Sequence, residues 1–313
     1  MWANGPRKEN GYSAKIMKPA YKIMFVFSLV LFVAASAAIA VYGLNFGVDF
    51  MGGSVMKIEF GQDRPSADEV QQSLSEMEVF KTGEVNVNLA GDKEVIIRTN
   101  ALSEQEHQQV LSGLASEFSG SAITEKQFDS IGPTVGRELR NKSLVAILIV
   151  LGTIMVYLAF VFRKLSGTLS LWVMNVATVI ALLHDIVIPL GVFAILGHFL
   201  GVQITAVFVA AILTILGYTV SDKVVIFDRV RENILRGSKE DLGSIVHKSV
   251  MQTLVRSINN TLTVMLSSAA IFFFGGESIK YFALALIMGV ALGAYSSIFV
   301  ASPLLVWWNP RRK

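Results

Sequence analysis

The chain has 313 residues, of which 53% are hydrophobic and only 16% charged, and its formal net charge is +3. Folded soluble domains carry about 25% charged residues, so this composition, with a mean hydropathy of +0.55, excludes an ordinary soluble protein. The sequence contains no cysteine, which excludes disulfides, thiolate nucleophiles and cysteine metal sites. The small net charge gives no sign of nucleic-acid binding.

The first 22 residues are polar and basic, and they precede an apolar run at residues 23–42. A basic start, an apolar centre and the small residues Ala38 and Ala40 also fit a cleaved signal peptide. A run of about 20 residues is long for a signal peptide and sufficient to cross a bilayer. We therefore expect a cytoplasmic segment at 1–22 and a first membrane span at 23–42, with the signal peptide as the alternative.

Residues 43–142 are polar and acidic, with sixteen Asp/Glu against nine Lys/Arg. Apolar and polar residues alternate over 54–60, which is the period of a strand. Ser66 with Glu69, and Ser103 with Glu106, form S-x-x-E capping boxes that each predict the start of a helix. Further strand-like segments lie at 84–89, 94–99 and 122–130. The order β-α-β-β-α-β predicts a small α+β domain of ferredoxin-like type.

Five further apolar runs follow, at residues 144–162, 169–196, 204–227, 254–274 and 281–308. With the first run they predict a polytopic α-helical membrane protein that has six transmembrane helices and one inserted α+β domain. Lys and Arg cluster after the second span, in the loop at 228–250 and in the closing segment 309–313, whereas the other two loops are nearly free of them. The positive-inside rule then places both termini in the cytoplasm and the domain at 43–142 in the periplasm.

Ionisable residues inside the spans are functional candidates, because each costs about 2.5 to 3.5 kcal/mol to insert. They are His184, Asp185, Asp222, Lys223 and Arg256. Asp222 and Arg256 each lie eighteen residues from the outer end of their runs, which cross the membrane in opposite directions. At about 1.5 Å per residue, both lie about 27 Å from the outer face. We therefore expect the two side chains to pair.

The span that carries Arg256 also has a polar stripe at helical spacing, formed by Gln252, Asn260, Thr263 and Ser267. Because lipid offers no hydrogen-bond partners, we expect this stripe to face the bundle interior or water. Protonation of Asp222 would release Arg256 and change the packing of the two helices, which is how a proton relay works. The alternative is a static pair that only fixes the register of the helices.

The other ionisable residues have simpler interpretations. We expect Lys223 to extend its ammonium group toward the cytoplasmic interface. His184 and Asp185 are adjacent in the third span, where a relay role and a structural hydrogen-bonding role fit equally well. No second His, Cys or carboxylate cluster completes a hydrolase or metal site, so we expect no catalytic residue, cofactor site or metal site. His107 fits a solvated helix residue.

Several segments of the spans have a distinctive sequence. The fourth span carries GYTVSD at 217–222 and VIFDRVREN at 225–233, the fifth carries QTLVRSIN at 252–259, and the third carries LHD at 183–185. These segments resemble the SecF family of protein-export subunits. The outer domain begins with FGVDFMGG at 46–53, which is similar to the family's G-[LV]-D-F-[TKR]-G-G motif in Gly47, Asp49, Gly52 and Gly53. The segment IGPTVG at 131–136, with Gly132, Pro133 and Gly136, resembles the family's entry into the second span. Met51 departs from the motif, because the family has a polar residue there.

The resemblance implies a non-enzymatic SecF-type subunit of the bacterial inner membrane. Such a subunit pairs with SecD and assists the SecYEG translocon, with YajC, YidC, the exported polypeptide and the lipid bilayer as further partners and nucleic acid as none. It implies that proton motive force supports late steps of export, with protons as the coupling ion and no cofactor. By this similarity Asp222 and Arg256 match the proton-pathway acid and its arginine partner.

Two other functions remain as alternatives. A small-molecule or lipid exporter of the resistance-nodulation-division superfamily would need a larger outer domain than about 100 residues. An intramembrane hydrolase that used His184 and Asp185 would need a nucleophile or a full metal-ligand set, which the spans do not provide.

Overall fold

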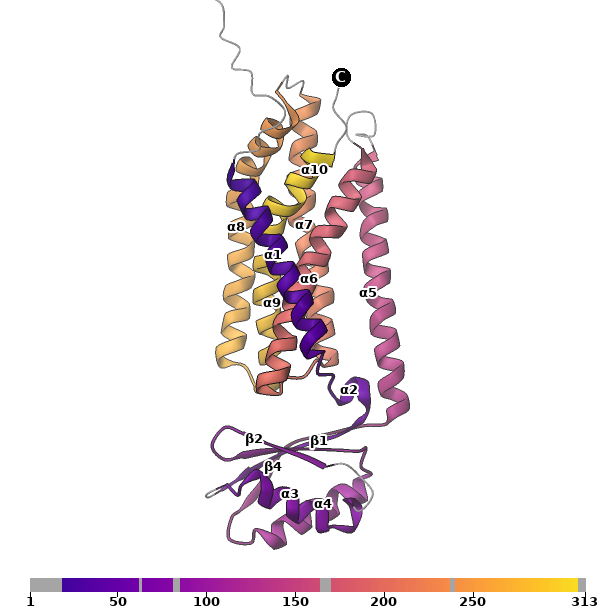
Figure 1. Ribbon diagram of the computed structural model, residues 1–313, viewed down its shortest axis with the longest axis vertical. Helices are drawn as coiled ribbons and strands as arrows, with labels where there is room; N and C mark the ends of the chain where they lie inside the picture. Colours follow the sequence, from indigo (N-terminus) through magenta and orange to yellow (C-terminus); the bar gives the residue numbers. More distant parts are fainter. Residues whose placement is uncertain (1–18, 62–63, 81–84, 164–169, 237–239, 309–313) are drawn as a thin grey trace, which may run out of the picture. The chain divides into compact units, whose positions relative to one another are not determined.

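The computed structural model describes residues 19–61, 64–80, 85–163, 170–236 and 240–308 (Figure 1). The chain divides into a helical unit, of residues 1–44, 146–202 and 207–313, and a smaller unit, of residues 45–145 and 203–206. The tail expected at 309–313 and most of the expected N-terminal segment at 1–22 lie outside the described residues.

Six stretches of helix in the described part of the chain are long and apolar enough to cross a membrane, as predicted. They are α1 (Pro19–Tyr42), α5 (Pro133–Val161), α6 (Leu171–Leu200), α7 (Ala206–Leu235), α8 (Leu242–Phe274), and a sixth span that joins α9 (Glu277–Ser296), a π-helical turn at Ser297–Ala301 and α10 (Ser302–Trp308).

Three helix boundaries differ from expectation by more than two turns. α5 begins at Pro133 rather than at 144, because proline at the first helical position has the backbone angle that a helix needs. The loop expected at 228–250 is largely helical, since α7 continues to Leu235 and α8 begins at Leu242. Charged pairs three residues apart, Arg229 with Glu232 and Arg231 with Asp228, support the added turns of α7.

Small residues let the membrane helices approach closely. A side-chain carbon at Gly191 of α6 would lie 2.5 Å from the Cα atom of Ala35 of α1. On α9, Gly289 and Gly293 stand one turn apart, and a carbon at Gly293 would lie 2.1 Å from Cγ2 of Thr219 on α7. Such small-xxx-small spacing allows backbone contact where no hydrophobic effect drives helix association. It seats α7, which carries Asp222 and Lys223, directly against α9.

The smaller unit is the predicted α+β domain. Its elements are β1 (Gly53–Phe60), α3 (Ala67–Glu76), β2 (Val85–Ala90), β3 (Glu94–Thr99), α4 (Glu104–Glu117) and β4 (Ile123–Ile131), preceded by the short helix α2 (Val48–Met51). The strands form one antiparallel sheet in the order β2-β3-β1-β4. The predicted order β-α-β-β-α-β is therefore confirmed.

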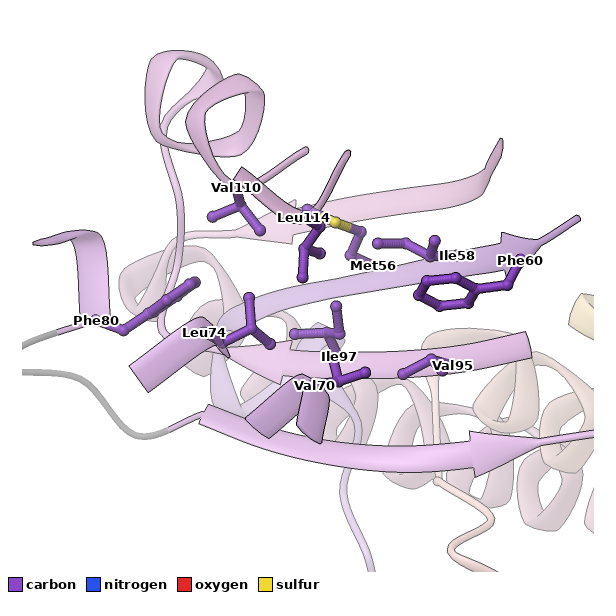
Figure 2. Close-up of a cluster of buried hydrophobic side chains, with 10 residues drawn as sticks. All are labelled: Met56, Ile58, Phe60, Val70, Leu74, Phe80, Val95, Ile97, Val110 and Leu114. Atoms are coloured by element: carbon purple, nitrogen blue, oxygen red, sulfur yellow. The ribbon is translucent and has the colours of Figure 1, made fainter. Parts of the chain in front are cut away.

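The core of this domain lies between the sheet and its two helices. Figure 2 shows Val70 and Leu74 of α3, and Val110 and Leu114 of α4, directed toward the strands. Residues of the strands at alternate positions, such as Ile58, complete the core.

Both predicted capping boxes are present. At the start of α4, the backbone N–H of Ser103 donates to Oε2 of Glu106 over 2.7 Å. This bond and a second from the Ser103 hydroxyl hold the pKa of Glu106 below its usual value.

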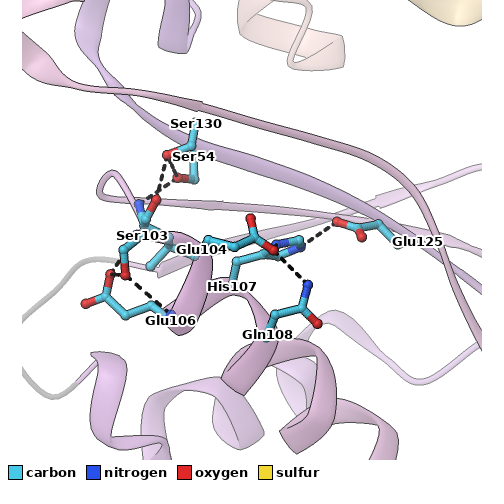
Figure 3. Close-up of polar contacts among 9 residues, drawn as sticks. Ser54, Ser103, Glu104, Glu106, His107, Gln108, Glu125 and Ser130 are labelled. Carbon is cyan, nitrogen blue, oxygen red and sulfur yellow. Dashed lines mark hydrogen bonds and ion pairs between the residues drawn. The ribbon is translucent and has the colours of Figure 1, made fainter.

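His107 is buried, and the expectation of a solvated residue is wrong. Its exposed fraction is 4%, and its Nε2 atom lies 2.7 Å from Oε1 of Glu125 (Figure 3). Its ring stacks on Phe128 with 3.7 Å between the ring centroids. The residue shares the inner face of α4 with Val110 and Leu114, three and seven positions later. The helical spacing alone predicts that this residue lies in the core, whereas the polarity of its side chain led us to expect a solvent-exposed position.

The FGVDFMGG segment connects the start of α7 to the domain. The N–H of Gly47 donates to the Ile204 carbonyl over 2.9 Å, and Oδ2 of Asp49 accepts from the Ala206 N–H over 2.7 Å. Ala206 is the first residue of α7, so Asp49 satisfies one of the free N–H groups at that helix end. The motif thus holds the beginning of the helix that carries Asp222.

Close backbone contacts explain the glycines of the same segment. Gly52 has φ +77, and a side-chain carbon there would lie 2.7 Å from Cα of Pro133. A carbon at Gly136 would lie 2.9 Å from the Gly52 nitrogen, whereas one at Gly132 would meet nothing within 4 Å. The backbone therefore passes close to itself at Gly52, Pro133 and Gly136, where a side chain would not fit at either glycine. At Gly132 no steric contact explains why the residue is glycine.

Candidate functional site

Asp222 is a buried carboxylate at the interface of α7 and α8. Its Oδ2 atom accepts a hydrogen bond from the Ser257 hydroxyl over 2.9 Å, and both residues are buried. Arg256, the expected partner, is exposed and forms no hydrogen bond or ion pair with Asp222 among the described residues. It interacts with Asp222 only electrostatically, through space. The prediction of a direct pair is therefore wrong. Ser257 lies on the face of α8 that contacts Asp222, whereas Arg256, one residue earlier, lies on a different, exposed face of the same helix.

Hydroxyl groups continue this interface for one more turn. Tyr218 precedes Asp222 by four residues on α7, and Thr261 follows Ser257 by four residues on α8. Both hydroxyl oxygens are buried, and the two side chains lie close enough to interact with each other. Since a hydroxyl both donates and accepts, these groups can form hydrogen bonds in either direction within this buried interface.

Lys223 lies in a second buried polar network, on another side of α7. Its ammonium group donates to Oδ2 of Asp185 over 2.8 Å and to the Thr219 carbonyl over 3.3 Å, and its exposed fraction is 0%. The expectation that Lys223 extends to the cytoplasmic interface is wrong. A fully buried counter-charge on α6 holds the ammonium group inside the bundle.

His184 extends this network to α1. Its Nδ1 atom lies 3.1 Å from Oδ1 of Asp185, and its Nε2 atom lies 2.6 Å from the Ser28 hydroxyl. The chain Ser28, His184, Asp185 and Lys223 thus joins α1, α6 and α7 by hydrogen bonds between buried side chains. Sequence reasoning named three of these residues but missed Ser28, which stands in an apolar helix with no neighbouring polar residue at helical spacing.

The two networks differ in charge. Asp185 has a lysine at ion-pair distance, so that this pair is neutral as a unit. Asp222 has a hydroxyl as its hydrogen-bond partner, and no cation lies at ion-pair distance from it in the described structure. Its charge is therefore less well compensated, which makes it the more suitable group to bind and release a proton.

The predicted polar stripe of α8 is exposed, although Gln252 at its N-terminal end accepts a hydrogen bond from the Asn233 amide of α7 over 3.0 Å. Gln252, Asn260, Thr263 and Ser267 are all exposed, and so is Arg256 between them. The face of α8 that packs inside carries a different set of hydroxyl residues, Ser249, Thr253, Ser257, Thr261 and Ser268. Sequence reasoning missed this second stripe, although four of its members recur at every fourth position. No group of three or more potential metal ligands occurs among the described residues.

Family models match the chain over most of its length. The model described as "Protein export membrane protein SecD/SecF, C-terminal" covers residues 113–311, and the one described as "SecD/SecF GG Motif" covers residues 37–63. The second match contains the segment that caps α7, and the first contains both buried networks except for Ser28.

Relatives agree with this assignment. Proteins called "Protein translocase subunit SecF" from Thermobaculum terrenum and from a Synechocystis strain are 40% and 36% identical, over 91% and 94% of this chain and 91% and 93% of theirs. A crystal structure of SecDF, a translocon-associated membrane protein from Thermus thermophilus, superimposes with a TM-score of 0.78 at 29% identity. That match covers 95% of this chain and 39% of the SecDF chain.

These names do not favour the small-molecule exporter that the sequence left open, because the relatives reported are translocase subunits. With matches along nearly its whole length, in motifs, sequence and fold alike, the chain belongs to the SecD/SecF family of protein-export membrane proteins, on the SecF side of that family.

Proposed function

We propose that this chain is an auxiliary, non-enzymatic subunit of protein export that couples proton movement to late steps of translocation. The observation that carries the proposal is Asp222, a buried carboxylate inside a membrane helix whose hydrogen-bond partner is the hydroxyl of Ser257. An ionisable group in such a place is costly and is retained in membrane proteins mainly where it moves ions or protons.

Proton binding at Asp222 would change the contact between α7 and α8. As a carboxylate, Asp222 accepts from Ser257 and attracts the nearby Arg256. Once protonated it loses that attraction, and its own O–H becomes a donor that Ser257 can accept. The favourable contacts between the two helices therefore differ before and after Asp222 binds a proton, as a two-state switch requires.

Movement of α7 has a direct route to the FGVDFMGG segment. Ala206 begins α7, and its N–H is hydrogen-bonded to Asp49 of that segment. Three residues after Phe50 of the same segment, β1 begins. A shift of α7 along its axis would therefore pull on the segment that leads into the sheet.

The membrane partner is a SecD-type subunit in this proposal. Arg256 and Asn260 of the exposed stripe on α8 have no hydrogen-bond partner among the described residues, and lipid supplies none. The SecDF protein of Thermus thermophilus is a longer chain, of which this one matches 40%. We place both termini in the cytoplasm of an inner membrane and the α+β domain outside, on the distribution of Lys and Arg. The SecYEG translocon and the exported polypeptide are the further partners, with YajC and YidC beside them.

The test is export in cells depleted of their own SecF and supplied with this chain. We expect the parent chain to restore proton-motive-force-dependent secretion and Asp222→Asn to insert normally but leave secretion near the depleted level. Asp228→Asn is the matched control, because Asp228 lies on the same helix and forms an exposed pair with Arg231. Secretion by Asp222→Asn at the parental level would show that the proton is carried elsewhere.

A further inference from the structure

The two edges of the sheet in the α+β domain are built differently. The β4 edge carries the charged residues Glu125, Lys126 and Asp129, and its pairing with β1 shifts register between Lys57 and Ile58. Charges and bulges on an edge strand prevent other chains from pairing with it. The β2 edge, VNVNLA, has no charged residue and no proline, and it pairs with β3 in one unbroken register.

One side chain occupies the outer edge of β2. The Nε2 group of Gln71, on α3, donates to the Val85 carbonyl over 2.5 Å, and the Val87 N–H donates to Oε1 of Gln71 over 3.2 Å. Val85 and Val87 are two positions apart, so their backbone groups point to the same side of the strand. Because a backbone N–H serves one partner, that side is the one turned away from β3.

The Gln71 amide therefore stands where a neighbouring strand would place a peptide group. It donates to one carbonyl and accepts from the N–H two residues later, which is the pair of bonds that an added strand makes. An incoming backbone can exchange these bonds one for one, so that little hydrogen-bonding free energy is lost when the side chain swings away.

We propose that the outer edge of β2 is a docking site for an extended polypeptide segment, which pairs with β2 as a fifth strand and displaces Gln71. The inference rests on the proposed export function, which supplies unfolded chain as the occupant. Recognition through main-chain hydrogen bonds is independent of sequence, as export of many different chains demands. The exposed amides of Asn86 and Asn88 flank this edge and add no charge that would select among occupants.

The chain's lack of cysteine makes the test direct, since one introduced cysteine carries a unique label. Asn88→Cys places a benzophenone photocrosslinker on β2, and Gln127→Cys places the same group on the exposed part of the β4 edge. The purified full chain in lipid nanodiscs is mixed with reduced, carboxymethylated lactalbumin, a polypeptide that stays unfolded. We expect a several-fold higher crosslink yield from position 88 than from position 127.

A second pair of variants tests the role of Gln71 itself. Gln71→Ala should raise the yield at position 88, because the edge is then open, whereas Gln72→Ala should leave it unchanged. Gln72 lies next to Gln71 on α3, but in the described structure its side chain bonds only to Glu76 on its own helix. The Asn88→Cys comparison with Gln127→Cys keeps Gln71 in place, so it remains decisive if Gln71→Ala folds poorly.

Equal yields at the two edges, or crosslinks at position 88 only to a second copy of the chain, would overturn the docking site. Either result leaves the secretion assay with Asp222→Asn unaffected, because that assay does not use the crosslinker. Failure of secretion by the parent chain, with the crosslinks present, would instead reject the export function and keep the edge as a binding site for extended chain.

Discussion

At the scale of single residues, the ion pair of Lys223 and Asp185 makes a sharp prediction. Both side chains are wholly buried, and the distance between Nζ and Oδ2 is 2.8 Å. Lys223→Met would leave the Asp185 carboxylate without its cation, and breaking a buried pair from one side costs about 3 to 5 kcal/mol. We expect a loss of this size in the free energy of unfolding, measured in detergent micelles by titration with a denaturing detergent.

The matched control removes both charges at once. In Lys223→Met with Asp185→Leu, neither charge is left unpaired, and most of the lost stability should return. A double variant as unstable as the single one would mean that Asp185 stabilises the bundle mainly through His184.

The same residues show what sequence could and could not predict at this scale. The insertion cost of charge singled out five ionisable residues of the apolar runs as candidates, and the structure buries four of them, all but Arg256. It did not reveal their partners, because depth along a helix is readable from residue counts whereas rotation about the helix axis is not. Arg256 and Ser257 have the same depth within one residue, and only Ser257 faces Asp222. The prediction for His107 was wrong for a different reason. Its spacing from Val110 and Leu114 indicated the buried face of the helix, but the polarity of the side chain was given more weight.

At the scale of elements, the seam between α7 and α9 depends on glycine. A side-chain carbon at Gly293 would lie 2.1 Å from Thr219, and the same carbon at Gly217 of α7 would meet nothing within 4 Å. Alanine favours a helix over glycine by about 1 kcal/mol, so both substitutions gain that term. Gly217→Ala should be neutral or stabilising, while Gly293→Ala should lose about 1 to 3 kcal/mol through overpacking. Thermal unfolding of the two purified variants and of the parent shows whether the change in stability has the opposite sign in the two variants.

Two stabilised variants would contradict the close packing of α7 on α9.

The elements themselves were well predicted, because span length, strand alternation and the capping boxes at Ser66 and Ser103 are local signals. The short helix α2 and the π-helical turn were not predicted, since neither has a periodic pattern of its own length. The sequence also could not show which face of α8 is buried, because both of its faces carry polar residues.

At the scale of the whole molecule, the exposed stripe of α8 indicates a chain that is completed by another membrane protein. Gln252, Arg256, Asn260 and Thr263 follow one exposed side of a membrane helix. Gln252 and Thr263 have hydrogen-bond partners within the chain, but Arg256 and Asn260 have none among the described residues. A polar group without a partner in hydrocarbon costs several kcal/mol, so we expect a partner subunit to cover the stripe. We expect Thr263→Trp to prevent that contact and to abolish co-purification of a tagged chain with a co-expressed SecD-type subunit.

The control for this prediction is a tryptophan on an apolar surface of similar exposure. Leu148 of α5 is 67% exposed, and Leu148→Trp should leave co-purification at the parental level, because an apolar face can remain in lipid. Loss of the partner in both variants would mean that the bulky residue disturbs the bundle rather than an interface. Retention in both would place the partner on another face, and the exposed stripe would then have to line water, which would bring solvent to Arg256.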